Sequence, residues 1–164
     1  MKNTQIRKAI SSDLENILNI YEYARSYMKK NGNSTQWGLS YPSRDLLEDD
    51  IRKEQLYVIT TDDTLHGVFA FIVGEDPTYK YIENGQWLSN EQYGTIHRIA
   101  GDGAIKGMFS IALEYCSSII PHMRLDTHKD NKTMQHLALK NGFKECGTIY
   151  VGDGSSRIAY EKIV

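Results

Sequence analysis

A strand, a glycine turn and a helix follow one another directly between Tyr93 and Ser117, and this unit constrains the fold most. Tyr93 to Ala100 favours a strand, Gly101-Asp102-Gly103 a turn, and the apolar spacing from Ile105 to Ser117 a helix that Pro121 ends. Free backbone N–H groups and the positive end of the helix dipole meet where such a helix begins. The unit can therefore hold an anion, although such glycines can also serve only to make a tight turn.

Further strands and helices are expected on both sides of this unit. Strands are expected at Thr4 to Ile10, Leu56 to Thr60, His66 to Val73 and Met123 to Thr127, with two more at the C-terminus that meet at Gly152-Asp153-Gly154. Helices are expected from Ser12 to a stop at Asn31-Gly32-Asn33, from Ser43 to about Lys53, and from Lys132 to about Asn141. The order β-α-α-β-β-β-α-β-α-β-β predicts one mixed sheet flanked by helices, while the polar segment from Gly74 to Asn90 remains unassigned.

The first of these helices carries a capping box and one apolar face. Ser12 and Glu15 have the spacing at which a serine and a glutamate satisfy each other's free backbone N–H groups. Apolar residues recur at three- and four-residue spacing at Leu14, Ile17, Leu18, Tyr21 and Ala24. We expect Tyr21, Tyr23 and Tyr27 to pack against the core rather than to bind a ligand.

Length and composition indicate one globular domain. The 164 residues, 40% hydrophobic and 24% charged, are enough for one buried core, and residues 1–164 are expected to form a single domain. The longest apolar run, Gly67 to Gly74, is much shorter than the roughly 20 residues that span a bilayer, and the N-terminus opens no hydrophobic signal segment. A cytoplasmic protein with no membrane partner is expected.

The charge pattern argues against a nucleic-acid partner, and the cysteines argue against a metal. The net charge is −2, with 19 basic and 21 acidic residues interspersed, so the chain offers no large positive field to a phosphate backbone. Cys116 and Cys146 lie far apart, and no Cys or His stands near either at metal-ligand spacing. Neither nucleic acid nor a metal ion is expected to bind.

Five short motifs in the second half of the chain follow a known order. They are Ile96-His97-Arg98-Ile99-Ala100, Lys106-Gly107, Leu125-Asp126-Thr127, Asn131 and Asn141-Gly142-Phe143. In order and spacing they resemble the GNAT superfamily of N-acetyltransferases, over about residues 95–143 for the motifs and nearly the whole chain for the element order. The resemblance implies an α/β fold with a mixed, mostly antiparallel central sheet, about four flanking helices, and splayed strands 4 and 5.

The resemblance also implies a site for acetyl-CoA as co-substrate. An extended pantetheine can pair with an exposed strand edge as an added strand would, and N–H groups at a helix start can hold the pyrophosphate. The implied cofactor-binding residues are Arg98, Ile99, Ala100, Ile105, Lys106, Gly107, Met108, Phe109, Ser110 and Asn131. Asn131 would either contact the pantetheine or cap the helix that follows it.

Two features depart from the family pattern. The usual turn reads Arg or Gln, two residues, Gly, one residue, then Gly or Ala, and here only Gly107 remains of it, in a turn that is also shorter than usual. Many members place a tyrosine, the general acid, four residues before the glycine of the Gly-Phe pair, where this chain has Ala138. Water, bulk buffer or Tyr150 would then have to protonate the leaving thiolate.

His97 is the expected catalytic base, and Tyr150 is the other expected catalytic residue. An alkyl ammonium with a pKa of about 10 must lose its proton before it can attack a thioester. An imidazole titrates near neutral pH, and the family counterpart of this strand often carries a base that faces the substrate. Alternatively, His97 only hydrogen-bonds a neighbour, or Glu83 or Asp126 serves as the base, although each of these also fits a surface or turn acid.

Aromatic and acidic residues in the segments that would rim the acceptor site suit a cationic amine. The residues expected there are Trp37, Tyr81, Glu83, Trp87 and Asp126, with packing in the core as the alternative for the aromatic ones. The expected function is transfer of an acetyl group from acetyl-CoA to a primary amine of a small molecule or peptide, by direct attack in a ternary complex. The alternative is an acyl-CoA-binding module with the same fold and no turnover. The C-terminal strands could pair or swap between two subunits, which would make a homodimer.

Overall fold

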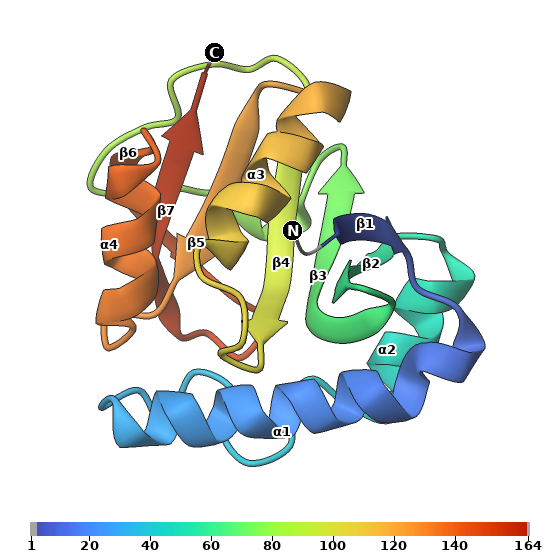
Figure 1. Ribbon diagram of the computed structural model, residues 1–164. Helices are drawn as coiled ribbons and strands as arrows, with labels where there is room; N and C mark the ends of the chain where they lie inside the picture. Colours follow the sequence, from blue (N-terminus) through green and yellow to red (C-terminus); the bar gives the residue numbers. More distant parts are fainter. Residues whose placement is uncertain (1–2, 164) are drawn as a thin grey trace.

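A seven-stranded sheet forms the centre of the molecule, as the computed structural model of residues 3–163 shows (Figure 1). The strand order is β1-β2-β3-β4-β5-β7-β6, and all neighbours are antiparallel except β4 and β5. This confirms the predicted mixed, mostly antiparallel sheet. The strands are β1 (Thr4–Lys8), β2 (Leu56–Thr61), β3 (Thr64–Val73), β4 (Gly94–Gly101), β5 (Met123–Thr127), β6 (Lys144–Tyr150) and β7 (Ser156–Lys162).

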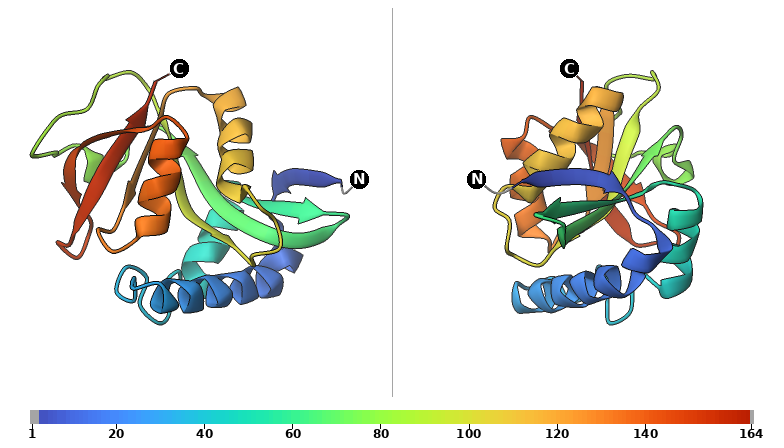
Figure 2. Two further views of the ribbon diagram at one scale, coloured as in Figure 1. Left: turned by 60° about the vertical axis from the view of Figure 1, so that its left-hand side comes forward. Right: turned by 45° about the vertical axis from the view of Figure 1, so that its right-hand side comes forward.

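Four α-helices in the described part of the chain cover the two faces of this sheet (Figures 1 and 2). They are α1 (Leu14–Lys30), α2 (Arg44–Arg52), α3 (Met108–Ile119) and α4 (Lys132–Lys140), with short 3-10 turns η1 (Ser11–Asp13) and η2 (Pro77–Tyr79). One core cluster joins α3 and α4 to one face, through Phe69 and Phe109, and a second joins α1 and α2 to the other, through Tyr21 and Val68. None of the helices in residues 3–163 is both long and apolar enough to span a membrane.

The hairpin of β2 and β3 follows from its turn residues. Asp62 and Asp63 have φ angles of 50° and 67°, the left-handed conformation that suits a two-residue turn between twisted strands. All residues of β2 are buried, so its two faces contribute to both core clusters. The predicted hairpin is confirmed, with β2 reaching Thr61 and β3 starting at Thr64.

Strands β4 and β5 separate soon after they begin. Their parallel register covers two pairs on β4, at Gly94 and Thr95, while β4 itself continues to Gly101. The register between β3 and β4 also shifts near Arg98, whose φ of 53° is left-handed. Such a bulge bends a strand away from its neighbour. The predicted splay of strands 4 and 5 is confirmed.

The prediction of a capping box at the start of the first helix is wrong. Asp13 closes the preceding turn instead, because its Oδ2 accepts a hydrogen bond from the Ile10 N–H at 2.8 Å. The guanidinium of Arg7 binds the same carboxylate at 2.8 and 2.9 Å, and mainly this contact lowers the pKa of Asp13. Helix α1 has no side-chain cap, and Glu15 pairs with Arg44 at 2.7 Å.

Helix α3 begins at Met108 rather than at the predicted Ile105. The Asp102 Oδ1 accepts a hydrogen bond from the Ala104 N–H at 2.9 Å, which extends the turn that follows β4. Gly107 then occupies the N-cap position with a left-handed φ of 70°, which glycine adopts at little cost. The turn therefore includes residues 105–107, which were predicted to begin the helix.

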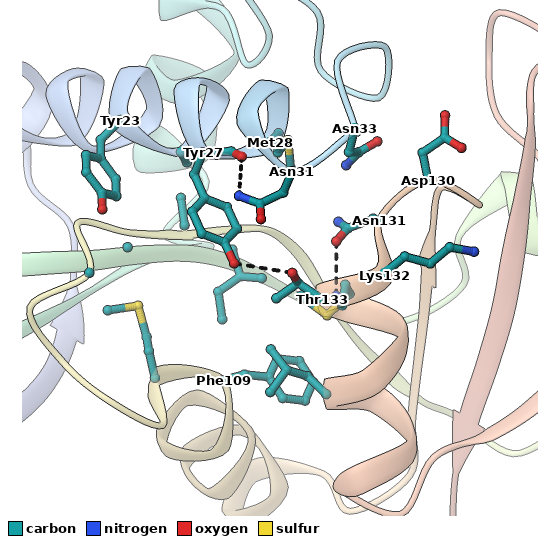
Figure 3. A pocket seen from close by; sticks show the side chains of 18 of the residues that line it. Tyr23, Tyr27, Met28, Asn31, Asn33, Phe109, Asp130, Asn131, Lys132 and Thr133 are labelled. Carbon is teal, nitrogen blue, oxygen red and sulfur yellow. Dashed lines mark hydrogen bonds between the residues drawn. The ribbon is translucent and has the colours of Figure 1, made fainter.

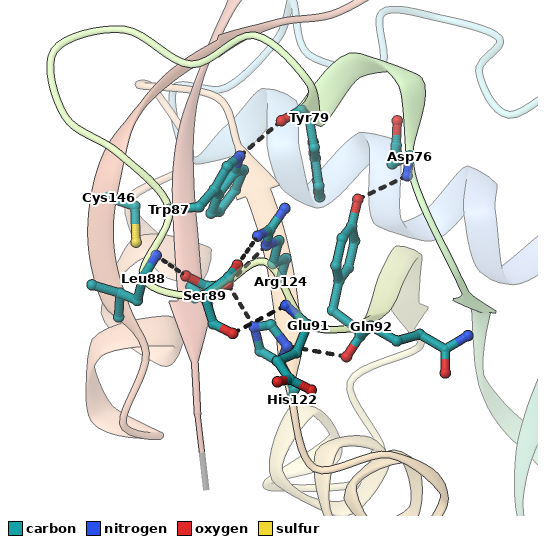
Figure 4. A network of polar contacts seen from close by, with 12 residues as sticks. Asp76, Tyr79, Trp87, Leu88, Ser89, Glu91, Gln92, His122, Arg124 and Cys146 are labelled. Carbon is teal, nitrogen blue, oxygen red and sulfur yellow. Dashed lines mark hydrogen bonds and ion pairs between the residues drawn. The ribbon is translucent and has the colours of Figure 1, made fainter.

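The polar segment that the sequence leaves unassigned packs on the sheet around Arg124 of β5 (Figure 4). The guanidinium carbon of Arg124 lies 4.1 Å from the ring centroids of both Trp87 and Tyr93. Its Nε donates a hydrogen bond to Glu161, which is fully buried, at 2.8 Å. This arrangement anchors the segment between β3 and β4 on the sheet.

Candidate active site

A narrow cavity of about 270 Å³ lies between α1, the end of β4, α3 and α4 (Figure 3). Its lining is mostly apolar, and six of the residues predicted to bind the cofactor belong to it: Ile99, Ala100, Ile105, Met108, Phe109 and Asn131. Because β4 has left β5 at this point, the free edge of β4 faces the gap between the two strands. The cavity thus has the shape and polarity to hold an extended, uncharged chain.

Two tyrosines of α1 line this narrow cavity, contrary to the packing role expected for them. Tyr23 and Tyr27 are 49% and 44% exposed, whereas Tyr21 is fully buried and packs as expected. The Tyr27 hydroxyl lies 3.3 Å from the Thr133 hydroxyl of α4, so α1 and α4 meet over the cavity (Figure 3). The sequence contained a signal for this shared, partly exposed position of the two tyrosines. Tyr23 and Tyr27 are four residues apart and lie off the apolar stripe of the helix.

The start of α3 offers free backbone donors beside the cavity. Gly107 has no side-chain cap, and the first intrahelical bond runs from the Ile111 N–H to the Gly107 carbonyl at 3.0 Å. The N–H groups that precede Ile111 are therefore available to an anion. Lys106, Gly107 and Ser110 do not line the cavity, and the Ser110 hydroxyl donates a hydrogen bond to the Asn141 Oδ1 at 3.0 Å.

The side chain of Arg98 has a structural partner of its own. Its guanidinium binds the carboxylate of Asp50, which is 1% exposed, with distances of 2.8 to 3.1 Å. The Arg98 carbonyl also accepts a hydrogen bond from the Tyr21 hydroxyl at 2.7 Å. Any contact of this residue with a cofactor would therefore come from its backbone rather than from its charge.

Asn131 caps α4, which is the second of the two roles expected for it. Its Oδ1 accepts a hydrogen bond from the Met134 N–H at 3.0 Å, and its Nδ2 donates to the Gln36 Oε1 at 3.1 Å. Asn131 also lines both the narrow cavity and a larger one beside it.

This wide cavity, of about 700 Å³, shares Ile99, Phe109 and Asn131 with the narrow cavity and extends to Asp76 and Arg157. His97 lies on its wall, with Nε2 at 3.1 Å from the Oδ2 of Asp76. Asp76 also accepts hydrogen bonds from the N–H and the hydroxyl of Thr78, at 2.9 and 2.7 Å. Burial would raise the pKa of Asp76, but His97 and Thr78 together lower it to about 2. A carboxylate that is ionised at neutral pH thus faces the ring of His97.

Asp126, predicted to bind the substrate, shares the wide cavity with His97. Its Oδ2 accepts a hydrogen bond from the Tyr79 hydroxyl at 2.6 Å. Burial raises the pKa of Asp126, and the charge of His97 and the hydrogen bond from Tyr79 offset only part of this rise. Trp37 lines the same cavity and packs against Tyr41, with ring centroids 6.2 Å apart.

The structure brings four of the residues predicted for catalysis or substrate binding to neither cavity. Tyr81 and Tyr150 both donate hydroxyl hydrogen bonds to the carboxylate of Glu83, at the protein surface. The Glu83 carboxylate raises the pKa of Tyr150, which makes its hydroxyl a weaker proton donor. Trp87 donates from its indole N–H to the Tyr79 carbonyl at 2.8 Å and belongs to the Arg124 cluster, which is the packing alternative.

Several residues of the wide cavity were missed by sequence reasoning. Asp76 and Thr78 lie in the polar segment that shows no periodicity, and Arg157 lies on a strand whose partner was unknown. No local pattern could have found them, because each reaches the cavity only through long-range folding. Ala138 of α4, at the position where many family members have a tyrosine, is fully buried in the core that α4 covers.

Known proteins were compared with the chain by sequence and by structure. No family model matches the sequence, and no curated protein matches it. A GNAT family acetyltransferase from Streptococcus agalactiae is 35% identical, with a TM-score of 0.84 over 98% of this chain and 95% of that chain. A GNAT family acetyltransferase from Listeria monocytogenes is 21% identical, with a TM-score of 0.70 over 100% of both chains. The PaiA N-acetyltransferase from Thermoplasma acidophilum, in complex with coenzyme A, is 18% identical, with a TM-score of 0.71 over 99% of both chains. This chain therefore belongs to the GNAT family of acetyltransferases.

Proposed function

We propose that this acetyltransferase moves the acetyl group of acetyl-CoA to a primary amine of a small molecule or peptide, by direct attack in a ternary complex. The observation that carries the proposal is that the two cavities adjoin. Both are lined by Met28, Ile99, Phe109, Asn131 and Met134, so they lie side by side at the end of β4 that has left β5. A donor in the narrow cavity and an acceptor in the wide one would meet there.

The narrow cavity fits the donor. The unpaired edge of β4 from Ile99 onward can hydrogen-bond the amides of pantetheine, and the N–H groups at the start of α3 can bind the pyrophosphate. Tyr23 and Tyr27 would cover the bound pantetheine from the side of α1. The coenzyme A complex of the Thermoplasma acidophilum protein, which shares the fold, is consistent with this arrangement.

The wide cavity fits the acceptor and the base. His97 takes the proton of the ammonium, and the ionised Asp76 at 3.1 Å stabilises the imidazolium that forms. The neutral amine then attacks the thioester carbon and a C–N bond forms. The nitrogen gives up its second proton to solvent, the C–S bond breaks, and coenzyme A leaves as its thiolate. Catalysis comes mainly from holding the two reactants together in the gap between the strands.

The thiolate needs no dedicated acid. A free thiol has a pKa of about 8.5, so water can protonate the leaving group near neutral pH. Tyr150, the acid suggested by the sequence, would have to leave Glu83 to reach the cavity. We therefore propose solvent as the proton source.

His97→Ala tests this mechanism. We expect kcat to fall by about 10²-fold, the lower end of the usual contribution of a general base. The affinity for acetyl-CoA should stay within about twofold, because the base acts only in the chemical step. His136→Ala, at an exposed position of α4, is the matched control and should keep the wild-type rate. A His97→Ala variant as fast as this control would remove His97 from the mechanism.

The second candidate, an acyl-CoA-binding module without turnover, is favoured by Ala138, which cannot donate a proton. Calorimetry with acetyl-CoA followed by a thiol-release assay over a panel of amines separates the two. Binding with turnover supports the transferase, and binding without turnover supports the module. No heat at millimolar acetyl-CoA would contradict both.

A further inference from the structure

Arg157, on the wall of the wide cavity, forms no direct ion pair with a described residue. It is 9% exposed, and its Nη1 donates hydrogen bonds only to neutral oxygens, the Ser155 hydroxyl and the Ser156 carbonyl, both at 2.9 Å. No carboxylate of residues 3–163 lies within 4.0 Å of its guanidinium nitrogens. Arg98, the other arginine of the same cavity, instead holds Asp50 at 2.8 Å. Arg157 therefore forms no direct ion pair within this range, although the carboxylates of Asp126 and Asp153, on the wall of the same cavity, lie within range of its charge.

Such a charge is costly unless an anion joins it. A guanidinium stays protonated at every physiological pH, so it cannot avoid the cost of burial by losing a proton. Buried arginines are accordingly found with carboxylates or phosphates, which accept two parallel hydrogen bonds from the planar fork. Since no residue in the described part of the chain places such a group within 4.0 Å of Arg157, its guanidinium is suited to bind an anionic group of another molecule.

Acidic groups stand close to Arg157 on the same wall. Asp126 of β5 pairs with Ala159 of β7, two residues beyond Arg157, so Asp126 and Arg157 are diagonal neighbours on one face of the sheet. Diagonal neighbours of this kind are roughly 7–8 Å apart. Asp126 in turn lies near His97 and Asp76, because these charges influence its pKa. The cavity therefore carries the carboxyls of Asp76 and Asp126 and the imidazole of His97, and next to them a guanidinium that forms no direct ion pair with residues 3–163.

We propose that the acceptor is an amine that also carries a carboxylate, of the size of an amino acid, and that Arg157 binds this carboxylate while the amine faces His97. This inference rests on the proposed acetyl transfer in the wide cavity. It departs from a purely cationic acceptor, for which the charge of Arg157 would be repulsive. Arg157 then decides specificity and takes no part in proton transfer.

Matched pairs of amines test the proposal: leucine and isoamylamine, tyrosine and tyramine, lysine and cadaverine. The two members of each pair differ only by a carboxylate. For at least one pair we expect the carboxylated member to have the higher kcat/KM in the wild-type protein. In Arg157→Gln, kcat/KM for the carboxylated member should fall by about 10- to 100-fold, as expected for a charged hydrogen bond. The rate for the amine without carboxylate should stay within about threefold. The intrinsic reactivities of the amines cancel in this comparison between proteins.

Two further variants separate recognition from folding. Arg157→Lys keeps the charge but not the fork, so it should retain part of the preference even if Arg157→Gln folds poorly. Ser155→Ala removes the hydroxyl that holds the guanidinium and leaves its charge in place, and it should keep the preference. A preference lost equally in Ser155→Ala and Arg157→Gln would mean that Arg157 only holds the turn, which would overturn the proposal.

A binding measurement distinguishes failure of this inference from failure of the proposed function. Calorimetry with N-acetyl-leucine in the presence of coenzyme A should show an affinity that Arg157→Gln weakens by about 10-fold or more. If amines are acetylated without any carboxylate preference, the inference is wrong and the transferase stands. If no amine is acetylated but this binding depends on Arg157, the transferase fails and the anion site stands. If neither dependence is seen, the anion site is wrong.

Discussion

At the scale of single residues, the candidate site is organised by a carboxylate that the sequence does not reveal. Asp76 comes from the segment before η2, and on the wall of the wide cavity its Oδ2 lies 3.1 Å from the Nε2 of His97 on β4. Thr78 fixes the carboxylate with two hydrogen bonds from its N–H and hydroxyl. His97 thus has a set orientation before any acceptor arrives, which is the arrangement that a general base requires.

The lowered pKa of Asp76 predicts a pH-dependent contribution to stability. A carboxyl whose pKa falls from about 4 in the unfolded chain to about 2 in the folded one contributes about 2 kcal/mol above pH 4. This contribution disappears as the pH falls through the folded value of about 2. Urea unfolding of wild type and Asp76→Asn should therefore differ by about 2 kcal/mol at pH 7, and the difference should shrink between pH 4 and pH 2. Glu22→Gln, at an exposed carboxyl of α1, is the control, and an equal, pH-independent effect in both variants would contradict the assignment.

At the scale of elements, the start of α3 depends on one backbone conformation. Gly107 has a φ of 70°, and a Cβ added there would have no atom within 4 Å. Gly107→Ala should therefore cost only the strain of a left-handed alanine, about 1–2 kcal/mol of unfolding free energy. Gly152→Ala, with equally open surroundings and no left-handed φ, should not destabilise. Thermal denaturation measures both, and equal melting temperatures for the two variants would contradict this account of the N-cap.

The segment between β3 and β4 depends on buried charge rather than on secondary structure (Figure 4). Arg124 binds Glu161 at 2.8 Å, His122 binds the same carboxylate oxygen at 2.6 Å, and the Tyr93 hydroxyl accepts a hydrogen bond from the Asp76 N–H at 2.8 Å. The cluster therefore connects the sheet to the carboxylate of the candidate site.

Replacing Arg124 should therefore strongly lower the free energy of unfolding. Arg124→Met leaves Glu161 buried with one cation fewer, and breaking a buried ion pair in this way typically costs about 3–5 kcal/mol. Arg52→Met removes an exposed ion pair with Asp49 on α2 and should cost less than about 1 kcal/mol. Chemical denaturation compares the two, and a loss in Arg124→Met no larger than in Arg52→Met would mean that the cluster adds nothing to stability.

At the scale of the whole molecule, the sequence predicted the elements better than the site. The order of helices and strands, the β2–β3 hairpin, the bounds of β5 and the splay of strands 4 and 5 are confirmed, because periodicity and turn residues are local signals. The start of α3 was placed too early, since a turn held by Asp102 and the left-handed Gly107 are not visible in apolar spacing.

The site needed contacts that only the folded chain makes. His97, Asp126 and Trp37 were named from the sequence and share the wide cavity. Asp76 and Arg157 were not named, because the partners that give them a role come from other elements. Tyr150 was named for its chemistry alone, and the fold pairs it with Glu83 away from both cavities.

The central claim is direct acetyl transfer between two adjoining cavities, and one single-turnover experiment tests it most directly. Protein in excess over radiolabelled acetyl-CoA is mixed with a small amine such as lysine, quenched with acid, and separated into protein, amine and coenzyme fractions. We expect the label to move from acetyl-CoA to the amine without passing through the protein, and to stay on acetyl-CoA when the amine is omitted. Label that accumulates on the protein would contradict direct attack, and label that never leaves acetyl-CoA with any amine tried would contradict the transferase itself.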